Sequence, residues 1–303
     1  MNKINQNPQV SIITVNYNQT QVTCEFLDSL EKNSFKNYEV IVIDNASIEN
    51  PTSTILLKYP WVKVVTSEEN LGFAGGNNLG IKIAKGEYLL FVNNDTEITE
   101  NFFEPLIHQL QSNPDVGIVS PKIKYFSHPE IIQYAGFSKI NSITGRNRTI
   151  GKKQKDLGQF NEPTNTHYAH GAAMMVSKKV IDKVGGMPEA FFLYYEEMDW
   201  CEKIKRAGFK IMYEPKSLIF HKESISVGNK NPLKTYYQTR NRILFMIRNF
   251  GGWNLLVFAF FFIFLTVPKW SVTYLVKGEI SYLKAFFRGI FWHFKLEKVP
   301  IGH

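Results

Sequence analysis

The residues best suited to chemistry lie between Phe191 and Trp200, where acids follow an aromatic run. Glu196, Glu197 and Asp199 come directly after that run. Carboxylates beside large apolar rings lose hydration, which raises their pKa and suits a general base. Acids at this point would also complement the N-terminus of a helix whose last turn is basic. The aromatic neighbours favour the general-base interpretation.

A second polar group, Asn93-Asn94-Asp95-Thr96, follows the apolar run 88–92. Oxygen ligands after a buried strand suit a hard divalent cation such as Mg²⁺ or Mn²⁺. Only Asp95 is charged, so substrate phosphate, water and another side chain would complete the coordination. A simple strand-ending turn is the alternative. His221 is a candidate only through its neighbours, because a lone histidine is more often structural.

Two further motifs suit a nucleotide. Asp44 ends an apolar run, where its carboxylate could accept hydrogen bonds from a base or a ribose, or could cap a turn. The stretch from Asn70 to Gly80 is rich in glycine and asparagine, and glycines at a helix N-terminus allow close approach of a phosphate. It departs from the dinucleotide pattern G-x-G-x-x-G, and a tight turn remains open.

The elements that must position these groups alternate regularly. Short β-branched runs predict strands, and helical spacing predicts helices between them, the first capped by Thr20. This order predicts βαβ units in a mainly parallel sheet, with ligands at the carboxyl ends of the strands. The expected strands are 10–15, 39–43, 62–65 and 88–92, and the polar groups that follow them are Asn16, Asp44, Asn70 and Asn93 to Asp95.

The second half of the chain is less regular. Residues 127–165 predict an irregular excursion, and order returns at 170–176. We then expect a short helix capped by Ser177, a strand at 210–213 and one long helix over 232–249. The organisation expected is a catalytic domain over residues 1–230 and a helical region over 231–303.

Composition narrows the partners and the compartment. Lys and Arg number 35 against 27 Asp and Glu, a net charge of +8 that suits phosphate or lipid partners. The two cysteines have neither metal-binding nor redox spacing, which fits a reduced compartment. The polar first nine residues lack the apolar core of a signal peptide, so we expect the chain to stay in the cytosol.

The motifs, taken in order from Val10 to Asn249, resemble the inverting GT-A glycosyltransferases of family 2, in particular their rhamnosyltransferase-like bacterial branch. The matching segments are VSIITVNYN, IDNAS, NLGFAGGN, NNDT and GGMPEAFFLYYEEMD. The resemblance implies a GT-A fold, a nucleotide-diphosphosugar donor and a glycan or lipid-linked glycan acceptor. It suggests rhamnose as the sugar.

The resemblance also implies roles for single residues. Asp44 would contact the nucleobase, Asp95 would bind the metal, Glu197 would be the catalytic base, and His221 would complete the metal or diphosphate site. Asn93 stands where many members have Asp. The remaining expected contacts are donor-binding Asn16, Asn70, Gly72, Asn77, Asn94 and Arg240, and acceptor or supporting His170, Glu196, Asp199 and Trp200. Arg240 and its neighbour Asn241 could meet the donor diphosphate or the phosphates of a lipid-linked acceptor, and a solvated basic face is the alternative.

The C-terminal part predicts membrane association. The apolar run from Trp253 to Val267 is shorter than a bilayer span, and its extension to Val276 includes Pro268 and Lys269. After it, an apolar stripe at helical spacing runs from Ile280 to Phe294, beside the basic residues Lys277, Lys284, Arg288 and Lys295. We expect an interfacial helix at the cytoplasmic face of a membrane. A hairpin packed on the catalytic domain or on a second subunit, as in a homodimer, is the alternative.

Three rival functions are weaker. A nicotinamide oxidoreductase lacks its glycine fingerprint. A non-catalytic membrane-docking or scaffolding protein on the same fold is favoured by Asn93 but not by the presence of Asp95, Glu197 and His221. Nucleic-acid binding is not expected, because the excess positive charge lies near the apolar C-terminus.

Overall fold

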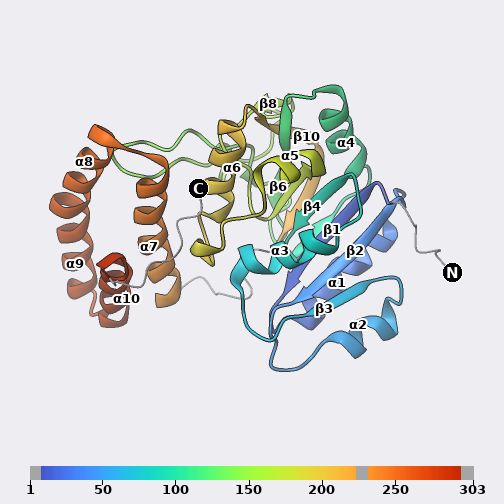
Figure 1. Ribbon diagram of the computed structural model, residues 1–303, viewed down its shortest axis with the longest axis horizontal. Helices are drawn as coiled ribbons and strands as arrows, with labels where there is room; N and C mark the ends of the chain where they lie inside the picture. The colour runs from blue at the N-terminus through green and yellow to red at the C-terminus, as the bar shows by residue number, and fades with distance from the viewer. Residues whose placement is uncertain (1–7, 223–230, 295–303) are drawn as a thin grey trace.

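The computed structural model describes residues 8–222 and 231–294 (Figure 1). A mixed sheet with the strand order β3-β2-β1-β4-β9-β6-β10-β5 forms the centre of residues 8–222, and helices cover both of its faces. The C-terminal helices stand beside it as a separate group. The predicted domain boundary at residue 230, most of the polar N-terminus and Lys295 lie outside the described residues.

The first half of the chain is the predicted run of βαβ units. β1 pairs in parallel with β2 and with β4, and β2 pairs in parallel with β3. Their carboxyl ends therefore lie along one edge, as the sequence predicted. The elements are β1 (Val10–Asn16), α1 (Thr20–Lys32), β2 (Tyr38–Asp44), α2 (Thr52–Lys58), β3 (Lys63–Thr66), α3 (Gly72–Ile83) and β4 (Tyr88–Val92).

The second half of the sheet is mixed. β9 lies antiparallel between β4 and β6, because the chain reaches it through the irregular excursion rather than through a helical crossover. β10 is parallel to β6. The elements are β5 (Thr96–Ile98), α4 (Phe103–Ser112), β6 (Val116–Tyr125), β7 (Ile132–Tyr134), β8 (Thr164–Asn165), β9 (Ala173–Ser177), α5 (Lys178–Val184), η1 (Glu189–Phe191), α6 (Glu196–Arg206) and β10 (Lys210–His221).

Three local predictions need correction. Thr20 is the first residue of α1 rather than its cap, and neither the cap residue Gln19 nor Ser177 before α5 makes a side-chain capping hydrogen bond. β10 continues to His221, well past the predicted end at Tyr213. Its length has a physical cause: the register against β6 shifts between Glu214 and Leu218, so the strand passes an irregularity and resumes pairing.

The excursion between β6 and β9 contains only short pairings, as predicted. Buried ion pairs anchor it to the sheet: Asp156 lies 3.1 Å from Lys122 and 2.8 Å from Lys124. The hydroxyl of Tyr134 donates to the carbonyl of Tyr168. These contacts hold the excursion over the strand ends of β6 and β10.

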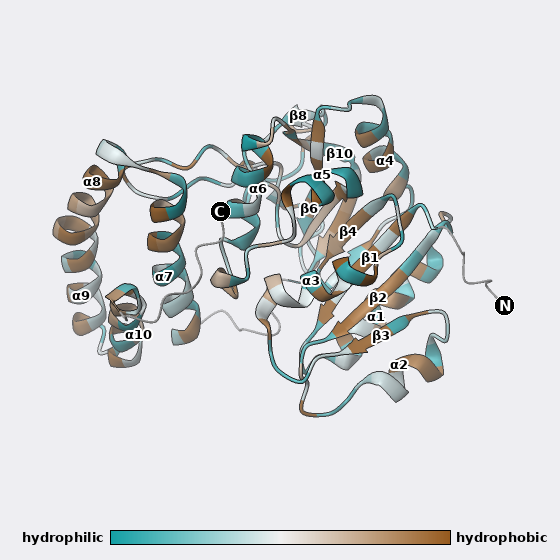
Figure 2. Cartoon of the chain, in the orientation of Figure 1, coloured by the Kyte–Doolittle hydropathy of each residue, from teal (hydrophilic) through white to brown (hydrophobic). Residues whose placement is uncertain are grey.

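The C-terminal region is helical, and its apolar residues are concentrated on α8 and α9 (Figure 2). Its members are α7 (Pro232–Asn249), α8 (Gly252–Phe261), the π-helical turn η2 (Phe262–Thr266), α9 (Val267–Val276), α10 (Ile280–Phe291) and η3 (Trp292–Phe294). α8, η2 and α9 form one rod of 25 residues, long and apolar enough to cross a membrane. The π turn directly precedes Pro268, whose ring clashes with the carbonyl four residues back in a regular helix.

The predicted interfacial stripe is placed differently. Leu283, Phe287 and Ile290 of α10 are partly buried against the core, whereas Ile280 and Phe294, at the two ends of the stripe, stay exposed. The apolar surface that stays exposed belongs mainly to the α8–α9 rod, which is only 17% buried over its most apolar window. Its most exposed apolar members are Trp253, Leu256, Phe260, Ile263, Phe264, Leu265, Val272, Leu275 and Val276.

Candidate active site

A chain of hydrogen bonds links the ends of β1, β2 and β4. Asn94 donates to the hydroxyl of Thr23, which donates to Asn16, and Asn16 donates at 2.9 Å to Asp44. Ser47 donates to the same Asp44 oxygen at 2.5 Å. The network is buried and fixes the carboxylate of Asp44 at the sheet edge. Asp44 therefore serves in part as the turn-forming residue that the sequence left open.

The glycine-rich turn is built as tightly as its composition suggests. Asn70 accepts a hydrogen bond from the amide of Gly72 and another from Asn45. Gly72 has φ +69°, and a Cβ there would lie 2.2 Å from the carbonyl oxygen of Phe192. Only glycine fits this contact. Asn77, expected to bind donor, is 1% exposed and donates to the carbonyl of Phe73 inside α3.

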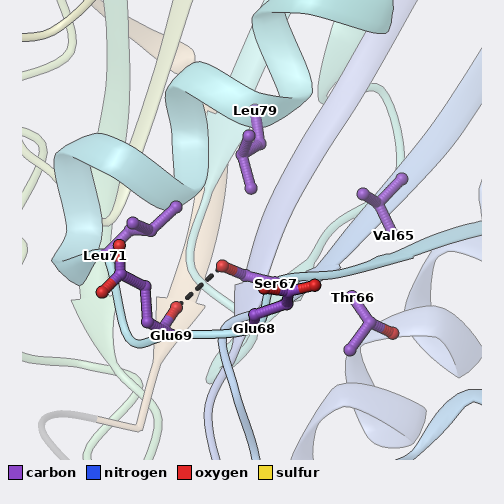
Figure 3. A pocket seen from close by; sticks show the side chains of 7 residues that line it. All are labelled: Val65, Thr66, Ser67, Glu68, Glu69, Leu71 and Leu79. Carbon is purple, nitrogen blue, oxygen red and sulfur yellow. Dashed lines mark hydrogen bonds between the residues drawn. The ribbon is translucent and has the colours of Figure 1, made fainter.

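Beside this turn lies a hollow of about 720 Å³ (Figure 3). Its wall runs from the end of β3 to α3, with Leu71 and Leu79 on the helix side. Ser67 at its floor donates a hydrogen bond to the carbonyl of Glu69. The hollow adjoins the Asn70–Gly72 turn, on the β3 side of the sheet edge, away from Asp95 and Glu197.

Asp95 and His221 meet at the opposite end of the same edge. Their side chains are buried, and Asp95 Oδ1 lies 3.1 Å from His221 Nε2. The other ring nitrogen, Nδ1, is 2.9 Å from the amide oxygen Oε1 of Gln133, an acceptor that fixes the proton on Nδ1. The lone pair of Nε2 then faces Oδ1 of Asp95. Both atoms are acceptors, so a proton or a cation between them would stabilise this contact.

This donor set suits a divalent cation. A carboxylate oxygen and an imidazole nitrogen are both common ligands of Mn²⁺-class metals, and Gln133 would orient the histidine in the usual way. Among the described residues, no three or more His, Cys, Asp or Glu side chains form a group that could hold a metal ion by itself. Asn93 and Asn94 add neutral oxygens nearby in sequence only, and Asn94 is engaged with Thr23. Donor phosphates and water would have to supply the other ligands.

His170 lies next to this pair, and its ring centre is 6.1 Å from that of His221. Burial, followed by the charge of His221, lowers the pKa of His170 to about 3. Its Nδ1 accepts from the amide of Ala172, and its ring stacks on Phe137. His170 is therefore neutral and structural in this arrangement, supporting the turn that follows it.

That turn connects the Asp95 end of the site to Glu197. The amide of Asn93 donates to the carbonyl of Ala172 at 3.0 Å. A Cβ on Gly171 would lie 4.0 Å from the carboxyl carbon of Glu197. The structure thus brings the predicted base to the same sheet edge as the predicted metal residues, with the small residues of the turn between them.

The loop that carries Glu197 is strained. Phe192, Tyr194 and Tyr195 all have positive φ, at 65°, 70° and 73°. Each non-glycine residue in this region costs about 1–3 kcal/mol, so the surrounding structure must hold the loop in place. Glu196 and Glu197 follow as the first two residues of α6. This clustering of strain is typical of functional sites.

Both acids have raised pKa values. Burial raises the pKa of Glu197 to about 7, and burial together with the charge of Glu197 raises that of Glu196 well above its usual range. Glu197 as a residue is half-buried, but its Oε2 is enclosed and, within the described part of the chain, has no hydrogen-bond partner. A carboxyl that titrates near neutral pH and is reachable from one side suits proton abstraction.

Asp199 and Trp200, also on α6, have structural roles. Asp199 binds Arg248 through a hydrogen bond of 3.1 Å and accepts from Asn249 at 2.6 Å, which ties α6 to α7. Trp200 is fully buried, donates to the carbonyl of Gly185, and packs edge-on against Phe91. Asp199 is thus committed to an ion pair and is poorly placed for a nucleophile.

Arg240 is buried in backbone contacts. Its guanidinium donates to the carbonyls of Ala190 and Phe191 and to the side chain of Asn241. It also lies over the rings of Tyr237 and Trp292. The sequence predicted that Arg240 contacts the donor diphosphate. Only guanidinium N–H groups that are not used in these contacts could do so.

Sequence reasoning missed three contributors: Thr23, Ser47 and Gln133. Thr23 and Ser47 lie within a few residues of recognised strand ends and could have been suspected. Gln133 comes from the irregular excursion, and nothing in its local sequence signals that it meets the site. Asn241 of α7 was expected at a phosphate, and in the structure it contacts the backbone of the 191–194 loop.

The comparisons with known proteins agree with this geometry. Residues 11–185, more than half of the 303-residue chain, match the family described as glycosyl transferase family 2. The chain belongs to this family. It is therefore a glycosyltransferase, as the motif order predicted, and its matched segment holds the strand-end cluster.

Two curated relatives cover most of the chain. The low-salt glycan biosynthesis hexosyltransferase Agl10 of Haloferax volcanii is 26% identical over 243 residues, covering 78% of this chain and 74% of the relative. The N-acetylglucosaminyl-diphospho-decaprenol L-rhamnosyltransferase of Mycobacterium tuberculosis is 21% identical over 263 residues, covering 80% of this chain and 85% of the relative. Curated relatives of this chain act in glycan and polysaccharide biosynthesis.

A solved structure shows the same fold. The mannosyltransferase PcManGT of Pyrobaculum calidifontis, in complex with GDP-Man and Mn²⁺, aligns with a TM-score of 0.57 at 14% identity. The alignment covers 98% of this chain and 90% of that one. The predicted GT-A fold class, an α/β sheet flanked by helices with a C-terminal apolar helical extension, is confirmed.

Proposed function

We propose that this family 2 transferase is inverting, and that it moves a sugar from a nucleotide diphosphosugar to a hydroxyl of a cell-surface polysaccharide or lipid-linked glycan. The observation that carries the proposal is Glu197: one enclosed carboxyl with a pKa raised to about 7, at the sheet edge that bears Asp44 and Asp95. One base suffices for a single displacement, which inverts the anomeric centre. A double displacement needs a second, nucleophilic carboxylate, and Asp199 is held by Arg248.

The chain's own residues perform the proposed steps in order. Asp44 accepts hydrogen bonds from the nucleoside and fixes its end of the donor. Glu197 takes the proton of the acceptor hydroxyl as its oxygen attacks the anomeric carbon. Burial of Glu197 keeps water from competing for that proton. Asp95 and His221 would hold a divalent cation, Mg²⁺ or Mn²⁺, which when bound neutralises the charge of the leaving diphosphate.

Two of the similar proteins support the proposed donor and acceptor. The mycobacterial relative is named for an L-rhamnosyl transfer to a lipid-linked diphospho-sugar, and PcManGT binds GDP-Man with Mn²⁺. Both support a nucleotide-sugar donor, a divalent metal and a glycan acceptor for this chain. Rhamnose is the sugar we propose, with other hexoses as competing outcomes of the test below.

We also propose that the C-terminal helices, residues 231–303, form a unit that seats the catalytic part, residues 1–230, on the cytoplasmic face of a membrane. The exposed apolar α8–α9 rod supports this arrangement, as do the exposed basic residues Lys277 at its end and Lys284 and Arg288 on α10. A second copy of the chain covering the rod, giving a homodimer, is the alternative that vesicle binding would exclude.

A thermal-shift panel tests the proposal. Nucleoside diphosphates and their sugars are added with Mn²⁺, Mg²⁺ or chelator to the wild type and to Asp95→Ala. A ligand that binds the native state raises the melting temperature. We expect a metal-dependent shift with one nucleotide base that disappears in Asp95→Ala. No shift with any nucleotide in folded wild type would favour a non-catalytic docking protein on this fold.

A further inference from the structure

The strained loop that carries the acids has its carbonyls gathered by one side chain on another helix. Asn241, in the middle of α7, donates through its Nδ2 to the carbonyls of Phe191 at 2.9 Å, Leu193 at 2.7 Å and Tyr194 at 2.8 Å. Asn241 is fully buried. These three carbonyls of one irregular loop converge on the same amide. Together they define the backbone path of the loop more closely than a single contact would.

A neighbouring arginine fixes the orientation of this amide. Arg240 Nε donates at 2.7 Å to Asn241 Oδ1, which directs Nδ2 toward the loop. The same guanidinium donates to Ala190 and Phe191, so Arg240 and Asn241 together bind the carbonyls of four residues between 190 and 194. The guanidinium also lies 4.9 Å from the ring centre of Tyr237 and 4.7 Å from that of Trp292, and these contacts help to keep it in place.

The loop is tied on its other side to the donor half of the site. The amide of Phe73 in α3 donates at 2.7 Å to the carbonyl of Phe192. The loop therefore lies between the glycine turn at Gly72 and α7, and its left-handed residues Tyr194 and Tyr195 lead directly into Glu196. Loss of the α7 tie would free the end of the loop that sets the direction of α6.

We propose that Asn241 is a positioning residue: its carboxamide holds the 191–195 loop in the strained path that aims Glu197 at the acceptor hydroxyl. This inference rests on the proposed role of Glu197 as the base. Asn241 itself touches no substrate, since both N–H bonds of its amide are used on the loop. A displacement of about 1 Å at a catalytic group lowers the rate by about 10²-fold.

The test replaces the amide with an isosteric group that cannot donate. Asn241→Asp keeps the shape and loses both N–H donors. The probe is release of nucleoside diphosphate from the donor selected by the thermal-shift panel, with Mn²⁺ and with water as acceptor. We expect kcat to fall about 10–100-fold while the Kd for the donor changes less than about twofold. Amide hydrogen exchange across residues 191–197 should rise.

The pH profile gives a readout that loss of packing alone would not move. A loosened loop admits water, so the acidic limb of the rate should move below pH 7 as the pKa of Glu197 falls toward its ordinary value. Asn241→Asp also adds a negative charge near Glu197. Gln238→Glu, at an exposed site on the same helix, controls for this charge. Asn249→Ala controls for the α6–α7 contact at Asp199. The titratable or charged groups that face Glu197 or its partner acid are Tyr194, Tyr195, Glu196, Cys201 and Arg240.

The outcomes separate this inference from the proposed function. If Glu197→Gln abolishes release but Asn241→Asp keeps the wild-type rate, exchange and pH profile, the positioning role is wrong and the base assignment stands. If donor affinity falls in parallel with the rate, Asn241 acts on the donor and the inference is also wrong. If Glu197→Gln keeps full activity, the base assignment itself fails. Should Asn241→Asp not fold, Asn241→Ser, which retains one donor, is read by the same three measurements.

Discussion

The two halves of the proposed active site are held by different means. The donor half, with Asn16, Asp44 and Asn94, lies at the ends of adjacent parallel strands and is joined by side-chain hydrogen bonds within the sheet edge. The base half, with Glu197, lies on a strained loop fixed from outside by α7. The first is set by strand register and the second by a contact some 50 residues away in sequence.

This difference separates binding from chemistry in the fold. Strand ends give a fixed surface on which a nucleotide can rest. A loop in left-handed backbone conformations needs support from several sides, and in return it delivers an enclosed carboxyl whose pKa lies near neutrality. Changes at the strand ends should therefore affect donor affinity, and changes at the loop should affect the rate.

The pH dependence should show the largest effect. Glu197 must be ionised to accept a proton, so the rate should fall about tenfold per pH unit below 7, about a hundredfold between pH 7.5 and 5. The measurement is kcat against pH with a saturating nucleotide sugar. Glu196→Gln should keep this limb, because Glu197 remains in place as the base; burial and the charge of Glu197 raise the pKa of Glu196 well above its ordinary range.

Stability should respond in the opposite sense. The pKa of Glu197 is raised from 4.5 to about 7 in the folded chain, so the folded state holds a proton that the unfolded state has released. Its contribution to stability is present below pH 4.5 and is lost as the pH rises to about 7. Glu197→Gln should weaken this decline when denaturant unfolding is followed at several pH values. A decline of equal slope in the variant would assign it to other groups.

Gly72→Ala should damage the contact between the two halves. The new Cβ would lie 2.2 Å from the carbonyl oxygen of Phe192, at a φ of +69°. We expect a loss of about 1–3 kcal/mol in the free energy of unfolding together with weaker donor binding. Gly208→Ala is the control, because its φ of +96° is equally unfavourable but nothing lies within 4 Å of its Cβ. Equal losses in the two variants would mean that backbone strain alone explains the effect.

Asp44→Ala should act on the donor half alone. It removes the acceptor of Asn16 and Ser47 and the proposed contact to the nucleoside. Calorimetric affinity for the nucleoside diphosphate should fall about tenfold, in line with loss of one charge-assisted hydrogen bond. Hydrogen exchange over residues 191–197 should remain as in the wild type. Asp28→Ala, on the exposed face of α1, should leave the affinity unchanged.

The smallest effect is expected at the membrane-facing rod. Phe260 is 65% exposed on α8, and Phe260→Ser should lower binding to anionic vesicles several-fold in flotation. Leu57→Ser on α2, at a leucine that is 90% exposed far from the rod in sequence, should leave binding unchanged. Equal binding of wild type and Phe260→Ser would count against the rod as the docking surface.

The donor half could be predicted from the sequence because its information is local. Each polar residue directly follows a β-branched apolar run, and parallel strands bring such ends together by geometry alone. The prediction placed Asn16, Asp44 and Asp95 on one edge, and the structure confirms it. The antiparallel entry of β9 could not be anticipated, because the 127–165 excursion has no periodic pattern to set its direction.

The base half could be predicted from the sequence only in part. The acids at 196 and 197 were evident from their aromatic neighbours, but their support was not. Arg240 and Asn241 were expected at a phosphate or on a solvated face, whereas the structure has both bound to backbone carbonyls of the loop. Such contacts depend on how α7 packs against α6, which is a tertiary relation without a local signal. The same limit applies to α10, whose amphipathic stripe packs inward.

The most direct test of the account compares donor binding and transfer in Glu197→Gln. The substitution keeps the size of the side chain and removes the base. We predict that transfer falls at least about 10²-fold while the affinity for the nucleotide sugar and Mn²⁺ stays within about twofold of wild type. Transfer at the wild-type rate in this variant would contradict the account, because no other enclosed carboxyl among the described residues combines this position with a pKa near 7.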